Sequence, residues 1–212
     1  MIRSVLLTTS GASPSSIPPA AFSVLRAYLE TRAHFTAADL EAVRAAFRFR
    51  RLVAGDYLQR AGDVTKLAAF VATGCLRQYV IDVKGKEHIV QFAPETWWLT
   101  DGASLTRGTP SAYFIDAIED SDLLLIDAPS HQRLLDGVPG FATAFRTGVQ
   151  RHSAAKDERI VSSLSASAEE RYVEFLRVYP SIAARVPQTM LASYLGVTPE
   201  TISRIRKNLS RR

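Results

Sequence analysis

Residues 188–207 read QTMLASYLGVTPETISRIRK, and this stretch is the most informative in the chain. Its pattern predicts two short helices joined by a tight turn. Gly196 supplies the left-handed backbone with which helices commonly end, Thr198 can cap the next helix, and Pro199 suits its first position. Apolar residues recur at helical spacing on both sides of the turn: Leu191 and Leu195, then Ile202, Ile205 and Leu209. The stretch therefore predicts a helix-turn-helix.

The second predicted helix is the one that such a motif places in the major groove of DNA. Its polar face carries Glu200, Ser203 and Arg204. Arginine can bond bidentately to guanine, and glutamate can accept a hydrogen bond from cytosine. From residue 188 onward the chain has five basic residues and one acidic residue. Most of the overall net charge of +5 therefore lies at this end, where the phosphates of DNA would be. We predict DNA binding; the alternative is an ordinary helical hairpin with a solvated basic tail.

A long helix is predicted to precede this domain, from Pro139 to Ser163. A stripe of residues at spacings of three and four runs along it: Phe141, Phe145, Val149, His152, Ala155 and Ile160. Such a helix either packs on its own domain or pairs with the same helix of a second subunit. We favour a homodimer, because a helix-turn-helix that recognises a palindrome needs two copies. Ser167 and Glu170 form a capping box at the start of the C-terminal domain.

Between residue 48 and residue 126 the apolar period changes to two, which predicts strands. Residues 74–83 and 88–92 form a predicted hairpin around Lys84-Gly85, and residues 112–117 and 123–126 form a second predicted pair. About eight short strands at this spacing favour a compact antiparallel roll. Short helices are expected on both sides of it, within residues 22–47 and 129–135.

The composition of the whole chain is that of a globular protein, with 47% hydrophobic and 22% charged residues among 212. No apolar run is long enough to span a membrane, so we expect a cytoplasmic protein with no membrane partner. Residues 1–21 are expected to form a disordered leader. The single Cys75 excludes an internal disulfide and an iron–sulfur cluster, and the histidines lack ligand spacing, so we predict no metal and no cofactor.

This order of elements resembles the Crp/Fnr transcription regulators. The sequence GCLRQY at 74–79 with KGKE at 84–87 is similar to the central hairpin of that family's roll. LASYLGV at 191–197 and PETISRIRK at 199–207 are similar to its C-terminal end. The resemblance spans residues 22–210 and implies an α+β chain. Its expected parts are the leader 1–21, a cyclic-nucleotide-binding-like antiparallel β-roll (double-stranded β-helix) with flanking helices at 22–138, a dimerisation helix at 139–164, and a helix-turn-helix domain at 165–212.

The resemblance also implies a dimeric transcription regulator that binds palindromic double-stranded DNA, with RNA polymerase as a further expected partner. The family's E-x-x-S-R recognition pattern falls on Glu200, Ser203 and Arg204, and members with this pattern bind half-sites containing TGA. Phosphate contacts are expected from a second set, of which the first three match positions in the family and the others act by charge alone: Gln188, Thr198, Thr201, Arg206, Lys207, Arg211 and Arg212.

The expected effector site departs from the family. Cyclic-nucleotide binders hold the ribose with a glutamate and the phosphate with an arginine, and here Asp101 and Ser111 stand at those positions. Because a phosphodiester would lose its charge-assisted partner, we predict no response to cyclic AMP through the usual cassette. A candidate pocket for an unidentified small-molecule effector surrounds the matching position: Trp97, Trp98, Asp101, Arg107, Ser111 and Tyr113. The alternative is a filled roll with both tryptophans in the core.

Two other functions are alternatives to DNA binding. The chain could be a small-molecule-binding roll whose helical tail contacts another protein and not DNA. An enzyme on a cupin-like roll is disfavoured, because such enzymes hold a metal with clustered histidines and His88 is the only histidine within the predicted strands. We therefore expect no enzymatic activity.

Overall fold

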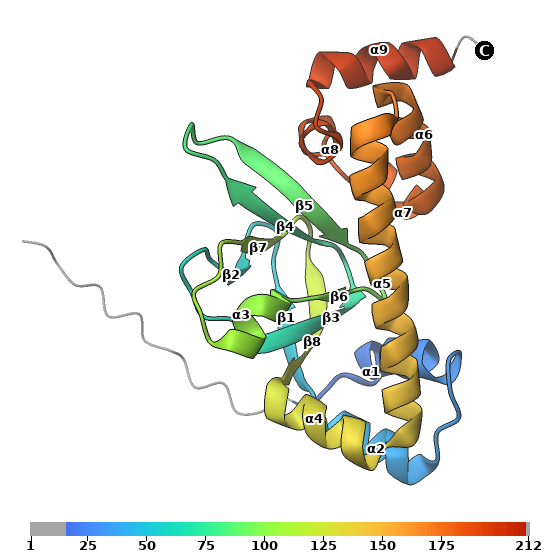
Figure 1. Cartoon of the computed structure of the whole chain (residues 1–212). Helices are drawn as coiled ribbons and strands as arrows, with labels where there is room; N and C mark the ends of the chain where they lie inside the picture. Colours follow the sequence, from blue (N-terminus) through green and yellow to red (C-terminus); the bar gives the residue numbers. More distant parts are fainter. Residues whose placement is uncertain (1–15, 211–212) are drawn as a thin grey trace, which may run out of the picture.

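The computed structural model describes residues 16–210, without the side chains of residues 149 and 151–158 (Figure 1). The expected leader is otherwise outside this range, but Ile17 and Ala21 are buried and the first helix begins at Pro19. The leader was therefore predicted too long, because apolar side chains at its end pack into the core. The helices are α1 (Pro19–Glu30), α2 (Ala37–Ala46), α3 (Gly102–Arg107), α4 (Ala128–Gly137), α5 (Pro139–Ser165), α6 (Ala168–Val178), α7 (Pro180–Ala183), α8 (Gln188–Leu195) and α9 (Pro199–Leu209).

The roll consists of two four-stranded antiparallel sheets within the described residues, with strand orders β1-β8-β3-β6 and β2-β7-β4-β5. An apolar core fills the space between them. This confirms the predicted α+β class with a roll of short strands. The strands are β1 (Arg48–Leu52), β2 (Tyr57–Gln59), β3 (Leu67–Thr73), β4 (Leu76–Ile81), β5 (Glu87–Ala93), β6 (Trp98–Leu99), β7 (Phe114–Ala117) and β8 (Ser121–Asp127).

The hairpin of β4 and β5 is confirmed, but the second predicted pair is wrong. Strand β7 pairs with β2 and β4, whereas β8 pairs with β1 and β3. The segment between β7 and β8 therefore crosses from one sheet to the other. This crossing lets Ile115 of β7 and Leu123 of β8 bury their side chains in the same core from opposite sides.

A second apolar core lies on the outer face of β3 and β8, where α1, α2, α4 and the first half of α5 cover the sheet. Phe141 is fully buried in this core, and Phe145 packs against it. Both residues were predicted for a dimer interface, and the structure places them in intramolecular packing instead. Of the other predicted interface residues, Ile160 is exposed, and the side chains of Val149, His152 and Ala155 lie outside the described part.

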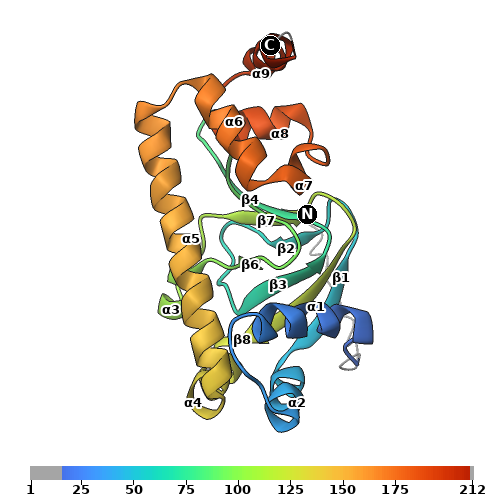
Figure 2. The same cartoon turned by 90° about the vertical axis from the view of Figure 1, so that its right-hand side faces the viewer.

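Helix α5 runs the length of the molecule and leads from α4 to the C-terminal helices (Figures 1 and 2). Those helices share a third core with the roll, in which Phe92 of β5 contacts Phe175 and Tyr194 with ring centroids 6.2 and 5.2 Å apart. The C-terminal domain is thus packed on the β4–β5 hairpin. Within residues 16–210, no helix is both long and apolar enough to cross a membrane.

Candidate DNA interface

The turn between α8 and α9 has the geometry that the sequence predicts. Gly196 has a φ of +68°, and the Val197 N–H donates to Ala192 O at 3.0 Å, which closes the end of α8. The Thr198 side chain accepts from the Thr201 N–H at 3.3 Å, and Pro199 occupies the first position of α9. The predicted cap, turn and helix start are all confirmed.

The two helices are held together by their apolar faces. Leu191 and Leu195 of α8 are buried against Ile202 and Ile205 of α9, in a core completed by Tyr172 and other residues of α6. Because this stripe is buried, the opposite face of α9 is turned outward. Figure 1 shows α9 at the end of the molecule opposite α4, away from the roll.

The three residues predicted to contact bases all lie exposed on α9: Glu200, Ser203 and Arg204. Hydrogen bonds from its own backbone N–H and from the Thr198 side chain hold the pKa of Glu200 below its ordinary value, so the side chain is an anionic acceptor at neutral pH. The Gln188 amide nitrogen donates to Ser203 Oγ and to Pro199 O, both at 2.6 Å. Gln188 thereby ties the start of α8 to the face of α9 that carries the predicted base contacts.

The residues predicted to contact phosphate have different surroundings. Lys207 is exposed, whereas Arg206 turns back to α6, where its Nε donates to the Tyr172 hydroxyl at 2.8 Å. Thr198 and Thr201 lie at the exposed start of α9 with their hydroxyls 3.2 Å apart. Arg211 and Arg212 lie outside the described residues.

Contacts between the domains were not predicted from the sequence. Strand β5 is an edge strand, so its outward N–H and C=O groups need partners. The Ser193 hydroxyl of α8 accepts from the Ile89 N–H at 3.0 Å and donates to Glu87 O at 2.8 Å. Arg159 of α5 donates to Val90 O, to Ile89 O at 3.0 Å and to Tyr194 O at 2.9 Å. These side chains cover the sheet edge. No local pattern in the sequence indicates these contacts.

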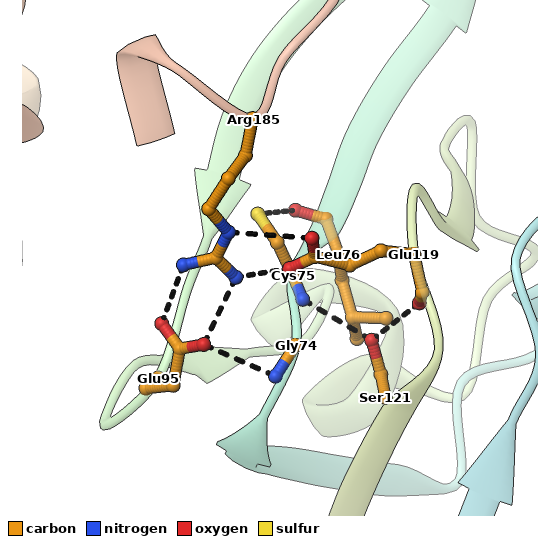
Figure 3. A network of polar contacts seen from close by, with 7 residues as sticks. All are labelled: Gly74, Cys75, Leu76, Glu95, Glu119, Ser121 and Arg185. Atoms are coloured by element: carbon orange, nitrogen blue, oxygen red, sulfur yellow. Dashed lines mark hydrogen bonds and ion pairs between the residues drawn. The ribbon is translucent and has the colours of Figure 1, made fainter. Parts of the chain in front are cut away.

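A charged cluster makes a second connection (Figure 3). The Arg185 guanidinium, from the segment before α8, lies between the carboxylates of Glu95 and Glu119 and bonds both, at 2.9 and 3.0 Å to Glu95. Burial, the largest single effect, would raise the pKa of Glu95, but the hydrogen bonds and charge of Arg185 and the backbone N–H groups of Glu95 and Gly74 together hold that pKa below its ordinary value. Beside the cluster, burial raises the pKa of the Cys75 thiol to about 12, so Cys75 stays protonated.

The six residues predicted to form an effector pocket do not come together. Trp97, just before β6, packs on Tyr179 with centroids 5.2 Å apart, whereas Trp98, the first residue of β6, joins the core under α1 and α5. Asp101 caps α3 by accepting from the Ala103 and Ser104 N–H groups, both at 3.1 Å. Arg107 lies at the end of α3, and in the loop that follows it the buried Ser111 accepts with its Oγ from the Tyr113 N–H at 3.0 Å.

Comparison with known proteins shows what this chain is similar to. Residues 49–137 match the model of the cyclic nucleotide-binding domain. A protein from Lacticaseibacillus casei named "Probable transcriptional regulator flp" is 27% identical over 146 residues, which is 66% of this chain and 66% of the relative. The chain is therefore similar to Crp/Fnr regulators, and residues 49–137 are similar to a cyclic nucleotide-binding domain. The predicted resemblance is confirmed.

Several solved structures share the fold. FixK2 from Bradyrhizobium japonicum has a TM-score of 0.67 at 18% identity, covering 78% of this chain and 85% of that one. The c-di-GMP responsive global regulator CLP from Xanthomonas campestris has a TM-score of 0.66 at 16% identity, with coverage of 83% and 92%. A regulator assigned to the crp/fnr family from Eubacterium rectale has a TM-score of 0.61 at 19% identity, with coverage of 83% and 84%.

Proposed function

We propose that this protein is a Crp/Fnr regulator, a dimeric and sequence-specific DNA-binding protein that acts in the cytoplasm. The observation that carries the proposal is the outer face of α9. Glu200, Ser203 and Arg204 are exposed there, on a helix whose other face is anchored by buried Ile202 and Ile205. A rigid helix that presents polar side chains away from its own domain suits direct contact with base edges.

Each exposed side chain has a role that its chemistry supports. Arg204 donates two hydrogen bonds to O6 and N7 of guanine, and the anionic Glu200 accepts from N4 of cytosine. Ser203 lies between them and is positioned by Gln188. Lys207, one turn beyond Ser203, neutralises a phosphate without selecting a sequence. The family pattern on these positions supports half-sites that contain TGA.

The dimer is proposed to form along the second half of α5. Three apolar side chains near its end are strongly exposed: Ile160 at 59%, Val161 at 62% and Leu164 at 84%. Pairing α5 with the same helix of a second copy would bury them, and it would present two α9 helices to a palindrome. Half-sites of such sites lie about 34 Å apart, one helical turn of DNA.

Selection of DNA sites from a random library, followed by titration of the selected site at several salt concentrations, tests this function. We expect a palindrome with TGA-containing halves and an affinity that falls steeply with salt, because phosphate contacts release counterions. The selection is repeated with Arg204→Ala, which should lose the sequence preference at one base pair of each half-site. No enrichment, with and without cell extract to supply an effector, would contradict the proposal. Addition of RNA polymerase to the selected complex then tests for the expected further partner.

A further inference from the structure

A cleft next to the cyclic-nucleotide cassette has the features of a ligand site. It is an open cavity of about 770 Å³ between the outer face of the roll, α3, α4 and the first half of α5. This volume lies within the roughly 300–1,000 Å³ of small-molecule sites. Figure 2 shows α3 and α4 on the side of the roll along which α5 runs. Asp101 and Ser111, which replace the family's cassette residues, are not among its lining residues.

Aromatic side chains form the walls of this cleft. Trp98 packs on Phe70 with centroids 5.3 Å apart, and its ring lies 6.5 Å from that of Phe145. The ring of His131 meets Phe145 edge-on at 4.3 Å, and Tyr28 closes the side next to α1. Because the apolar core holds these rings from behind, the walls are in place before a ligand arrives.

Few charged side chains line the cleft. Among its described lining residues there is no lysine or arginine, and the one carboxylate, on Asp127, accepts from the Ser130 N–H at 2.8 Å and pairs with Arg48 at 3.3 Å. Burial lowers the pKa of His131, so its ring is neutral at pH 7. The polar groups that remain are neutral, such as the amide of Gln91. An ionised ligand would lose its hydration here without gaining a partner of opposite charge.

We propose that this cleft binds a small, uncharged aromatic molecule, which packs against Trp98 and Phe145 on the open side of the cleft. The ligand would contact α5 through Phe145, and Arg159 of the same helix bonds the edge of β5 and Tyr194 of the DNA-binding domain. The site is therefore placed to act as the effector site, a role that rests on the proposed function.

Calorimetric titration of the full chain with 2-naphthol and with indole tests the site. We expect one saturable site per chain, and binding at least tenfold weaker for the anion 2-naphthalenesulfonate. Ala68→Leu extends a lining residue into the cleft and should weaken 2-naphthol binding at least tenfold. Ala112→Leu is the matched control, because Ala112 is exposed and does not line the cleft, and it should bind like the wild type.

Several outcomes would overturn the proposal. The first is that neither probe shows saturable binding, and the second is that 2-naphthalenesulfonate binds as tightly as 2-naphthol. The third is that Ala68→Leu binds 2-naphthol as tightly as the wild type does. If Ala68→Leu fails to fold by circular dichroism, Gln132→Trp, which narrows the cleft from the surface of α4, replaces it. A concentration-dependent loss of probe binding that parallels dimer formation would mean that a second copy fills the cleft. DNA-site selection with the same variants is a separate readout, so loss of probe binding with intact DNA binding concerns this cleft alone.

Discussion

Replacement of Ser193 by alanine should loosen the DNA-binding domain from the roll. The Ser193 hydroxyl satisfies two backbone groups of the β5 edge, the Ile89 N–H and the Glu87 C=O. Each such bond contributes about 0.5–1.5 kcal/mol net, so the pair contributes about 1–3 kcal/mol to docking. That range corresponds to about a 5- to 150-fold change in the docking equilibrium. Because both bonds are only partly buried, we expect the lower half of the range.

Hydrogen exchange of the Ile89 amide measures this effect directly. In Ser193→Ala it should exchange at least about fivefold faster, since opening of the interface exposes it. Ser163→Ala is the matched control, because the Ser163 hydroxyl donates only to Ile160 O within α5, at 2.7 Å. The Val71 amide, bonded inside the roll to Trp97 O, should not change in either variant. Unchanged exchange at Ile89 in Ser193→Ala would refute the idea that this hydroxyl holds the domains together.

The other predictions concern the DNA interface, the dimer and acid stability. Arg204→Ala should cost about 1–3 kcal/mol at the selected site and relax one base pair, as measured by fluorescence anisotropy; an equal loss on random DNA would mean that Arg204 contacts only phosphate. Lys207→Ala should weaken all sequences alike and reduce the salt slope by about one for each half-site; an unchanged slope would place it outside the interface. Leu164→Glu should yield monomers in sedimentation experiments, because pairing would bury an uncompensated carboxylate, and a persistent dimer would contradict the proposed interface. The folded-state pKa of Glu95 lies below its ordinary value of 4.5, so the unfolded state takes up the proton first and this contribution to stability is lost as pH falls below about 4.5. Urea unfolding at about pH 6 and about pH 3.5 should show a smaller loss of stability in Glu95→Gln than in the wild type; equal losses would contradict this assignment.

Local sequence patterns were sufficient to predict the structure of the helix-turn-helix. Gly196, Thr198 and Pro199 specify a helix end, a cap and a helix start through their own backbone preferences. The structure shows these features, and the capping box of Ser167 and Glu170, where they were predicted. The exposed face of α9 followed from the helical spacing of its apolar residues. All of these depend on neighbours within a few positions, which is why they can be inferred without a tertiary structure.

Contacts between residues far apart in the chain could be known only from the folded structure. Adjacent β7 and β8 lie in different sheets, and Trp97 and Trp98 face different cores, because each strand buries its side chains against partners far away in sequence. The bond between Ser193 and Ile89 joins residues 104 positions apart. A serine hydroxyl has the same chemistry at any surface position, and only the docking of α8 on an edge strand gives this one its partner.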